Sequence, residues 1–421
     1  MQRSSLQATR RSGRLAGIAM TGFQLIALFV SLAAALSFLN SRYLKLPPQV
    51  GLLVLSLAGS LVVLALDEVR VIDAAKVRAI VDEADFSKTL LDGMLGILLF
   101  AGAMHVDLRT MRTQRWPIVA LSVGGTLLST ILIGFAIHAV LGVVGLPVTL
   151  IDAMLFGALI SPTDPIAVLG MLKRSRVPAE ASVQIAGESL FNDGVGVVIF
   201  TTLLAVRGGD HMTASEVGVL FLRQAFGGAV FGLVVGGIGA RLLRDCAEST
   251  VQILVTLAVV LGGYALADEL GLSGPIGMVV AGIIVGHQLP SPPLLSFWEL
   301  ADELLNALLF VMLGLEATRM HLDVRLVIAA IAAVPIVLGA RLVSVVASIA
   351  LVHPFGARPI AHAKLLLTWG GLRGGLAVAL ALALPPSADR DVLLAITYVV
   401  VTCSVIGQGM TMPWLLRRLD L

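Results

Sequence analysis

Four polar residues lie within six positions of an otherwise apolar stretch, and their types suit them to bind a cation or a proton. They are Glu188, Ser189, Asn192 and Asp193, in the string GESLFNDG. On a helix, Ser189 and Asp193 lie one turn apart and form a column of oxygen atoms. The other two residues are also one turn apart, about 100° around the helix. Inside a membrane such residues indicate function, because polar groups are costly there.

A second cluster is the string SPTDP at Ser161–Pro165. Each proline removes a backbone donor and disfavours helical geometry in the residue before it. We therefore expect the helix to open here and to leave carbonyl groups near Ala158 and Ser161 without partners. These carbonyls, the Thr163 hydroxyl and the Asp164 carboxylate are hard oxygen donors, which suit a hard cation.

The third cluster is an arginine among glycines, in the string WGGLRGG at Trp369–Gly375. Four glycines make a weak helix, and Arg373 keeps its charge when it is buried. It therefore needs an anion at the same depth. Glu188 is the expected partner, because Asp193 and Asp164 must stay free to titrate. The sequence thus predicts a structural Glu188–Arg373 ion pair.

The remaining candidates give weaker signals. Arg223 and Arg341 also lie inside apolar segments, but without polar companions. We interpret each as a snorkelling side chain or as half of an ion pair between packed helices. Cys246 and Cys403 suggest neither a disulfide framework nor a metal site. No Walker A sequence is present, so we expect neither ATP-driven transport nor a cofactor.

The composition places these clusters in a membrane. Of the 421 residues, 57% are hydrophobic and 13% are charged, and the mean hydropathy is +0.97, whereas about 25% of a soluble protein is charged. The net charge of +2 gives no basic surface for nucleic acid. An all-α multi-pass membrane protein is expected. Because a spanning helix needs about 20 apolar residues, thirteen segments qualify: 16–39, 48–66, 90–106, 116–141, 149–171, 182–206, 215–243, 250–268, 275–287, 297–316, 324–352, 361–384 and 391–416.

Two of these segments are broken, the fifth by prolines and the twelfth by glycines, and about half the chain separates them. This spacing suggests a single membrane domain over 1–421 with two repeats of opposite orientation, at about 16–206 and 250–416. A helix at about 215–243 would link them. The polar interval Asp67–Lys88 is interpreted as an amphipathic helix at the membrane interface.

The flanking charges indicate how the chain sits in the bilayer. The basic N-terminal tail and the apolar run after it resemble a signal peptide, but the run is too long for one, so we expect a retained first helix. If Arg417 and Arg418 are cytoplasmic, most Lys and Arg residues of the loops fall on the same side. The C-terminus is therefore expected in the cytoplasm of a bacterial cell, while the side of the N-terminus stays open.

Together, the strings SPTDP, GESLFNDG and WGGLRGG resemble those of the monovalent cation:proton antiporter-1 family, and its NhaP-type sodium/proton antiporters in particular. The resemblance covers essentially the whole chain. It implies an antiporter fold of about thirteen spans, with two inverted repeats whose broken helices cross, and a homodimer. It also implies exchange of a monovalent cation for H⁺, with roles in pH and sodium homeostasis. Na⁺ is the expected cation, and Li⁺ and K⁺ stay open.

The resemblance assigns transport roles to five residues. Asp193 is implied to carry either the cation or the proton, and the neighbouring Asn192 to support the unwound helix. Ser189 and Thr163 are implied to help bind the cation. Asp164 is implied to orient water or ligands around that cation.

The resemblance to the family has three further implications. Glu188 and Arg373 correspond to the family's structural ion pair. Asn192 stands where electrogenic relatives carry a second aspartate, which suggests electroneutral 1:1 exchange. Some archaeal members have an acidic residue on the third segment, whereas Phe100–Ala103 is apolar here. The set of cation ligands seen in those members therefore does not transfer directly.

Competition for one carboxylate would couple the two ions. Protonated Asp193 and ionised Asp193 with one monovalent cation are both neutral, whereas a bare carboxylate is costly to enclose. Three other functions stay open: a sodium-coupled organic-anion symporter of the same broad fold, a passive channel, and an intramembrane aspartyl protease using Asp164 and Asp193. The protease would need a Gly-x-Gly-Asp signature that the chain lacks.

Overall fold

Helices make up nearly all of the ordered structure. The computed structural model describes residues 21–71, 73–85, 88–164, 166–172, 177–209, 213–288, 291–319, 323–352 and 362–419. Within these ranges the only β-type contact is an isolated bridge between Asp164 and Leu372. Eight helical stretches of this part of the chain are long and apolar enough to span a membrane, and three shorter helices are also apolar. The composition therefore predicted the fold class correctly.

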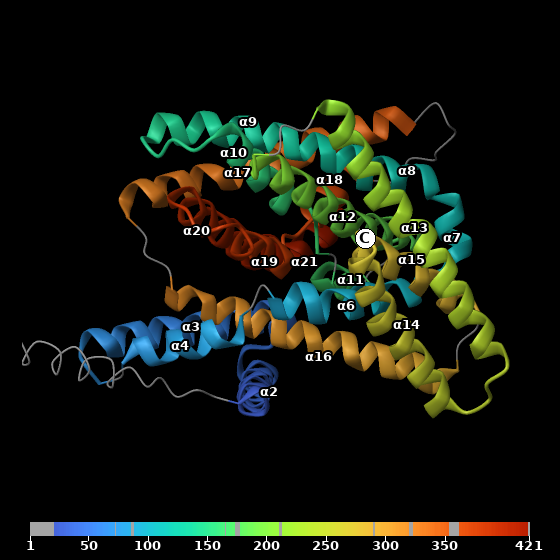
Figure 1. Cartoon of the computed structure of the whole chain (residues 1–421). Helices are drawn as coiled ribbons and strands as arrows, with labels where there is room; N and C mark the ends of the chain where they lie inside the picture. The colour runs from blue at the N-terminus through green and yellow to red at the C-terminus, as the bar shows by residue number, and fades with distance from the viewer. Residues whose placement is uncertain are drawn as a thin grey trace, which may run out of the picture.

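Each predicted segment contains helix (Figure 1). The basic tail and the start of the first segment, at residues 1–20, lie outside the described residues. In chain order the helices are α2 (Gly22–Leu39), α3 (Pro48–Glu68), α6 (Leu95–Met104), α9 (Thr126–Val144), α10 and α11 (Leu150–Ile160, Ile166–Leu172), α12 (Ala179–Arg207), α13 (Ala214–Arg244), α14 (Ser249–Glu269), α15 (Gly274–Gly286), α16 (Pro292–Glu316), α17 (Val324–Val352), α18 and α19 (Ala363–Trp369, Gly375–Leu382), and α20 and α21 (Ala388–Cys403, Gly409–Arg418).

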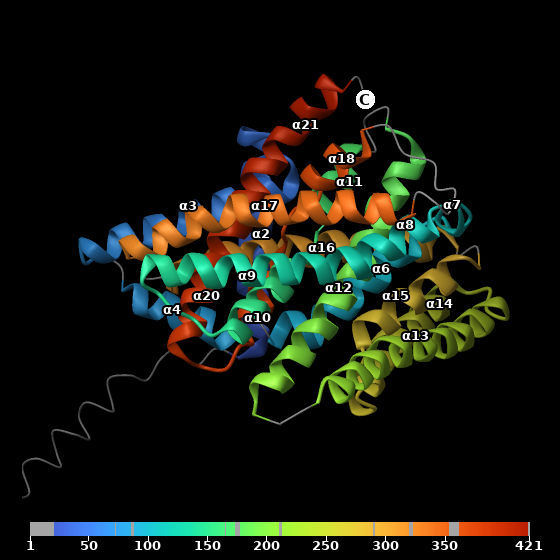
Figure 2. The ribbon, with the colours of Figure 1, turned by 90° about the horizontal axis from the view of Figure 1, so that it is seen from above.

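Two sets of helices pack on α12. On one side, α10 contacts both α9 and α12, and α17 packs on α9 and α20. On the other side, α13, α14 and α6 gather around α15, and α16 lies against α3 and α6. Figure 2 shows α13, α14 and α15 together at one edge, with α9 and α17 side by side across the molecule. The division into two inverted repeats stays a prediction.

Small residues allow α13 and α15 to approach closely. Gly228, Gly232 and Gly236 recur every four residues along α13 and so share one face. A Cβ atom on Gly232 would lie 2.4 Å from the carbonyl oxygen of Gly277, and one on Gly236 would lie 2.7 Å from the Cα atom of Ala281. Helices in lipid associate mainly through such close packing, because lipid gives them little hydrophobic reason to do so.

A short helix occupies the polar interval between the second and third predicted segments. It is α4 (Ala74–Ala84). Arg78 on α4 donates a hydrogen bond from Nε to the carbonyl oxygen of Thr318 at 2.8 Å. The interval is therefore helical and is tied to the end of α16, whereas its position at the membrane interface stays a prediction.

The two broken segments meet at their interruptions. α10 ends at Ile160, and α18 ends at Trp369. In the bridge between the two breaks, the Asp164 amide donates to the carbonyl oxygen of Leu372 at 2.8 Å. A Cβ atom on Gly374 would lie 2.6 Å from Oδ2 of Asp164, so this crossing requires a glycine. Pro165, the second predicted helix breaker, lies outside the described residues.

A buried ion pair holds α12 against α17, and it corrects one prediction. Glu188 pairs with Arg341, not with Arg373; the two side chains are 1% and 5% exposed. Arg341 also donates from Nη2 to the carbonyl oxygen of Leu367 at 2.9 Å. The prediction failed because depth alone does not say which helix faces Glu188. Arg341 on α17 faces Glu188. Of the two interpretations of Arg341 given above, half of an ion pair between packed helices is therefore the correct one.

Removing Arg341 should destabilise the protein strongly. In Arg341→Ala, Glu188 would remain buried without its partner, at a cost of about 3–5 kcal/mol. Replacing both residues with Met should restore most of that loss, because an apolar pair of similar volume leaves no charge unpaired. Fluorescence-detected size-exclusion chromatography after heating measures the change in Tm.

Arg223→Ala is the matched control, since Arg223 is also an arginine within a span but is exposed. Its Tm should stay close to that of the parent. An Arg341→Ala protein as stable as the Arg223→Ala protein would show that the pair does not hold α12 and α17 together.

Candidate functional site

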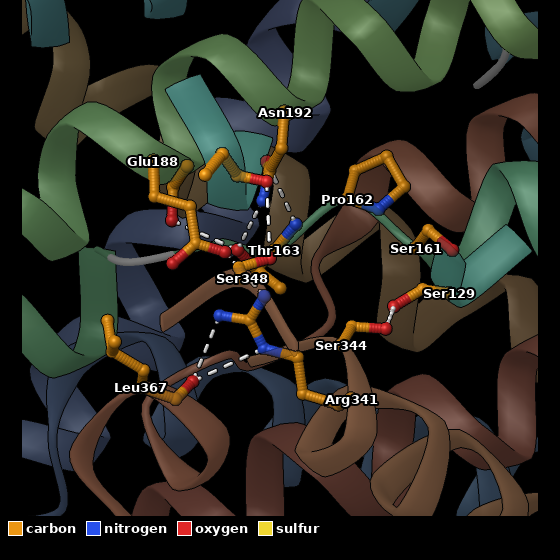
Figure 3. A network of polar contacts seen from close by, with 12 residues as sticks. Ser129, Ser161, Pro162, Thr163, Glu188, Asn192, Arg341, Ser344, Ser348 and Leu367 are labelled. Carbon is orange, nitrogen blue, oxygen red and sulfur yellow. Dashed lines mark hydrogen bonds and ion pairs between the residues drawn. The ribbon is translucent and has the colours of Figure 1, made fainter. Parts of the chain in front are cut away.

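Side chains from α12 reach the break between α10 and α11 and hold it in place. The Asn192 amide contacts Thr163 twice: Nδ2 donates to the Thr163 hydroxyl at 2.8 Å, and Oδ1 accepts from the Thr163 backbone N–H at 3.3 Å. The Thr163 hydroxyl also lies 3.0 Å from that of Ser189. All three residues are buried, and Figure 3 shows the Asn192 side chain directed toward Thr163.

This geometry has a simple local cause. Ser189 and Asn192 are three residues apart on one helix, so both can reach the same neighbouring residue. The break itself has non-helical backbone, and the Asn192 amide oxygen gives a partner to an N–H group that would otherwise be unsatisfied in the membrane. A Cβ atom on Gly196 would lie 2.3 Å from Cγ of Pro162. The absence of a side chain at Gly196 therefore lets α12 approach the broken segment closely.

The two candidate carboxylates come from the two elements that meet here. Asp193 follows Asn192 on α12, and Asp164 follows Thr163 in the break. Both side chains are half-buried, and the two carboxylates lie within electrostatic range of each other. Within the described residues, the Asp193 carboxylate forms no hydrogen bond or ion pair with the protein. It is therefore the carboxylate best placed to accept an ion.

Arg373 has a role that the sequence did not indicate. Its side chain is buried, and Nη1 donates to the carbonyl oxygens of Ser161 at 2.6 Å and Pro162 at 3.0 Å. It therefore caps the C-terminal end of α10, where the helix dipole is negative. The prediction of a partnerless carbonyl near Ser161 is wrong, because a guanidinium already occupies the position that a cation would need.

Side-chain oxygen atoms also lie near this break. They belong to Thr163, Ser189, Asp164 and Asp193, the four residues named from the sequence. In the described residues, no group of three or more His, Cys, Asp or Glu side chains could hold a metal ion. Two hydroxyl groups and two carboxylates are hard oxygen donors, which suit a hard cation.

Several supporting contacts were not predicted from the sequence. Ser129 on α9 and Ser344 on α17 share a hydrogen bond of 2.8 Å, and Figure 3 shows this pair beside Ser161. Their polarity within apolar helices was the available signal. The Arg373 backbone N–H donates to Ser404 at 3.0 Å. Ser404 begins a π-helical turn, η6 (Ser404–Gln408), which no local pattern of residues indicated.

The third segment contributes only apolar contacts near α12. A Cβ atom on Gly102 of α6 would lie 3.1 Å from Cδ2 of Leu190, and Phe100 and Ala101 are buried. The apolar character of this stretch, noted from the sequence, therefore also describes its contacts in the structure. Phe100–Ala103 contains no acidic side chain, so this part of α6 adds no carboxylate to the site.

Comparison with known proteins places this geometry in a family. Residues 26–418 match the family described as sodium/hydrogen exchanger, transmembrane. The Na⁺/H⁺ antiporter NhaP of Pseudomonas aeruginosa is 42% identical over 408 residues, which cover 94% of this chain and 96% of that protein. The Na⁺/H⁺ antiporter NhaH of Halobacillus dabanensis is 33% identical, with 94% and 96% covered.

The fold has also been seen in a solved structure. The sodium proton antiporter MjNhaP1 from Methanocaldococcus jannaschii at pH 8 superposes with a TM-score of 0.73 over 94% of this chain and 97% of that one, at 21% identity. At this identity the likeness establishes the antiporter fold alone. Because the family match spans residues 26–418 and relatives above 30% identity cover nearly the whole chain, this protein belongs to the transmembrane sodium/hydrogen exchanger family.

Proposed function

We propose that this chain exchanges Na⁺ for H⁺ across the cell membrane and that Asp193 carries the two ions in turn. The observation that carries the proposal is the position of Asp193. It follows the Asn192 that holds the α10–α11 break, and no described residue occupies its carboxylate. The relatives from Pseudomonas aeruginosa and Halobacillus dabanensis, at 42% and 33% identity, are both named Na⁺/H⁺ antiporters. As a member of this family the chain is a transporter and not an enzyme.

Competition for a single carboxylate supplies the coupling. Asp193 is neutral when it is protonated, and it is neutral again when it is ionised with one monovalent cation bound. Enclosing the bare carboxylate in the membrane would be costly. Only the two neutral forms would therefore pass between the inward- and outward-facing states, so each Na⁺ that crosses in one direction is matched by an H⁺ in the other.

The neighbouring oxygens would complete the cation site. The Thr163 hydroxyl accepts a hydrogen bond from Asn192 and shares one with Ser189. A hydroxyl oxygen has two lone pairs, so when Thr163 donates to Ser189, each of the two oxygens keeps one lone pair for the cation beside Asp193. Asp164 lies within electrostatic range and would orient water or ligands around the ion.

The charges around the site favour electroneutral 1:1 exchange. Asn192 cannot titrate, and the charge of Glu188 is balanced by Arg341. Arg373 keeps a constant charge against the α10 carbonyls. Asp193 is then the group whose charge changes during the cycle. The same chemistry admits Li⁺ and K⁺, since each offers one positive charge to the same oxygens.

Several broader features belong to the same proposal. The protein would act as a homodimer in a bacterial cell membrane, with its C-terminus in the cytoplasm. Its two halves, about 16–206 and 250–416, would be inverted repeats joined by α13. In this arrangement the crossing of the two breaks would lie close to the middle of the bilayer, where inverted-repeat transporters place their sites.

Asp193→Asn should abolish exchange while the protein still folds, because the amide cannot take up a proton. The measurement is recovery of a trapped pH dye in proteoliposomes after Na⁺ is added, with elution volume and Tm as folding controls. Asp164→Asn should instead keep exchange but weaken apparent Na⁺ affinity about tenfold, equivalent to about 1.4 kcal/mol. Exchange that persists in Asp193→Asn would refute the carrier role.

Electroneutral exchange should not respond to membrane potential. In proteoliposomes with equal K⁺ on both sides, valinomycin clamps the potential at zero, and the initial Na⁺-driven proton flux should be the same with and without it. A flux that rises when valinomycin is added would mean that net charge moves in each cycle. In that case a second group besides Asp193 must change its charge.

A further inference from the structure

A cavity of about 290 Å³ lies behind the crossing, and no step of the proposed exchange uses it. It opens between the middle of α17 and the junction of α20, η6 and α21. Arg373 lines it from the crossing. The other lining residues are Val334, Val337, Leu338, Trp369, Val400, Cys403, Ser404, Gly407, Gln408 and Thr411.

The cavity is open at the surface of a membrane-spanning helical stretch, a surface that we expect to face lipid. Cys403, Gly407 and Thr411 line it and are exposed, and all three lie within the membrane-spanning stretch Asp389–Arg418. The walls toward α17 are aliphatic. An occupant can therefore enter sideways from the hydrocarbon and needs an apolar body.

The inner end of the cavity is polar and positively charged. The Arg373 side chain is 2% exposed, and Arg341 is near enough to repel it. Glu188 attracts Arg373 as well, but its ion pair is with Arg341, so one carboxylate faces two guanidinium groups here. Within the described residues, the ion pair at this place is the one between Glu188 and Arg341. Charge complementarity at this end therefore calls for an anion.

The polar groups that surround Arg373 are held in fixed positions. Ser404 accepts the Arg373 backbone N–H and donates to the Gln408 side chain, which in turn donates to the carbonyl oxygen of Trp369 at 3.1 Å. Trp369 Nε1 donates to the Thr411 hydroxyl at 2.9 Å. The wide π-helical turn of η6 places Ser404 and Gln408 here, and such turns often occur at functional sites.

We propose that this cavity is a binding site for a long-chain fatty acid, with its carboxylate on Arg373 and its acyl chain leaving between α17 and α20. A carboxylate matches the planar donor fork of arginine. A fatty acid also loses its charge when protonated, so it can cross hydrocarbon to reach a buried site. A phosphodiester headgroup keeps its charge, so moving it through hydrocarbon would cost the full free energy of desolvating an ion.

Binding would act on the transport site without occupying it. Arg373 Nη1 holds the carbonyl groups of Ser161 and Pro162 at the end of α10. A carboxylate on the same guanidinium would compete for that charge and weaken the cap. The cavity would therefore be a regulatory site, separate from the residues that carry Na⁺ and H⁺.

The test uses Cys403 at the mouth of the cavity as a natural reporter. Cys246→Ser removes the other cysteine of the chain, and the labelling rate of Cys403 by a membrane-permeant maleimide is measured in purified protein with oleic acid. At a free concentration about three times the Kd, the rate should fall about fourfold, because the free fraction falls by the factor 1 + [L]/Kd. Oleyl alcohol, which lacks the carboxylate, should give no protection.

Two leucine variants separate binding in the cavity from general contact with lipid. A Cβ atom on Gly407 or on Gly339 would meet no other atom within 4 Å, so either residue can be enlarged without a clash. Gly407 lines the cavity, whereas Gly339 does not. Photocrosslinking with a diazirine fatty acid should be lost in Gly407→Leu and unchanged in Gly339→Leu.

Each contrary result would overturn the proposal in a different way. Equal protection by oleyl alcohol would show that the cavity holds any acyl chain and that Arg373 does not select a carboxylate. Equal protection by phosphatidylglycerol would make the anion a phospholipid headgroup. Equal crosslinking of both leucine variants would place the fatty acid elsewhere on the protein. None of these readouts depends on transport, so they are independent of the proposed exchange.

Discussion

Backbone groups that leave a helix inside a membrane need partners within the protein, because lipid offers none. The two interruptions of this chain meet that constraint largely by satisfying each other. The Asp164 amide bonds to the Leu372 carbonyl, and Arg373 supplies donors to the carbonyls at the end of α10. Asn192 on α12 holds Thr163 from the other side. The position of every residue proposed to contact the cation follows from this crossing.

The charges at the crossing divide into fixed and variable ones. Glu188 is neutralised by Arg341, which also holds the end of α18 through Leu367. Arg373 is occupied by the α10 carbonyls. The arginines are thus committed to structure, and in the proposed cycle Asp193 is the carboxylate whose charge varies. This separation would give a physical basis for coupling: the scaffold would keep its charge while one group exchanges a proton for a cation.

Much of this arrangement could be predicted from the sequence, because polar residues in apolar segments and helix-breaking prolines and glycines are strong local signals. They indicated both broken helices, and they named Thr163, Ser189 and Asn192, which the structure brings into contact; the transport role of Asp193 stays a prediction. The partner of Glu188 could not be found in this way, since it depends on which helix faces α12. The cap on the Ser161 carbonyl was missed for the same reason: it is formed by Arg373, from the other half of the chain.

The central claim is that Na⁺ and H⁺ exclude each other at Asp193, and proton release on Na⁺ binding tests it most directly. Purified protein in weakly buffered detergent solution, at a pH where Asp193 is protonated, is mixed with Na⁺ while a pH dye reports free protons. Close to one proton should appear for each Na⁺ bound, because the ligand must lose its proton, and none should appear with Asp193→Asn. Sodium binding without proton release, or equal release from the variant, would contradict the account.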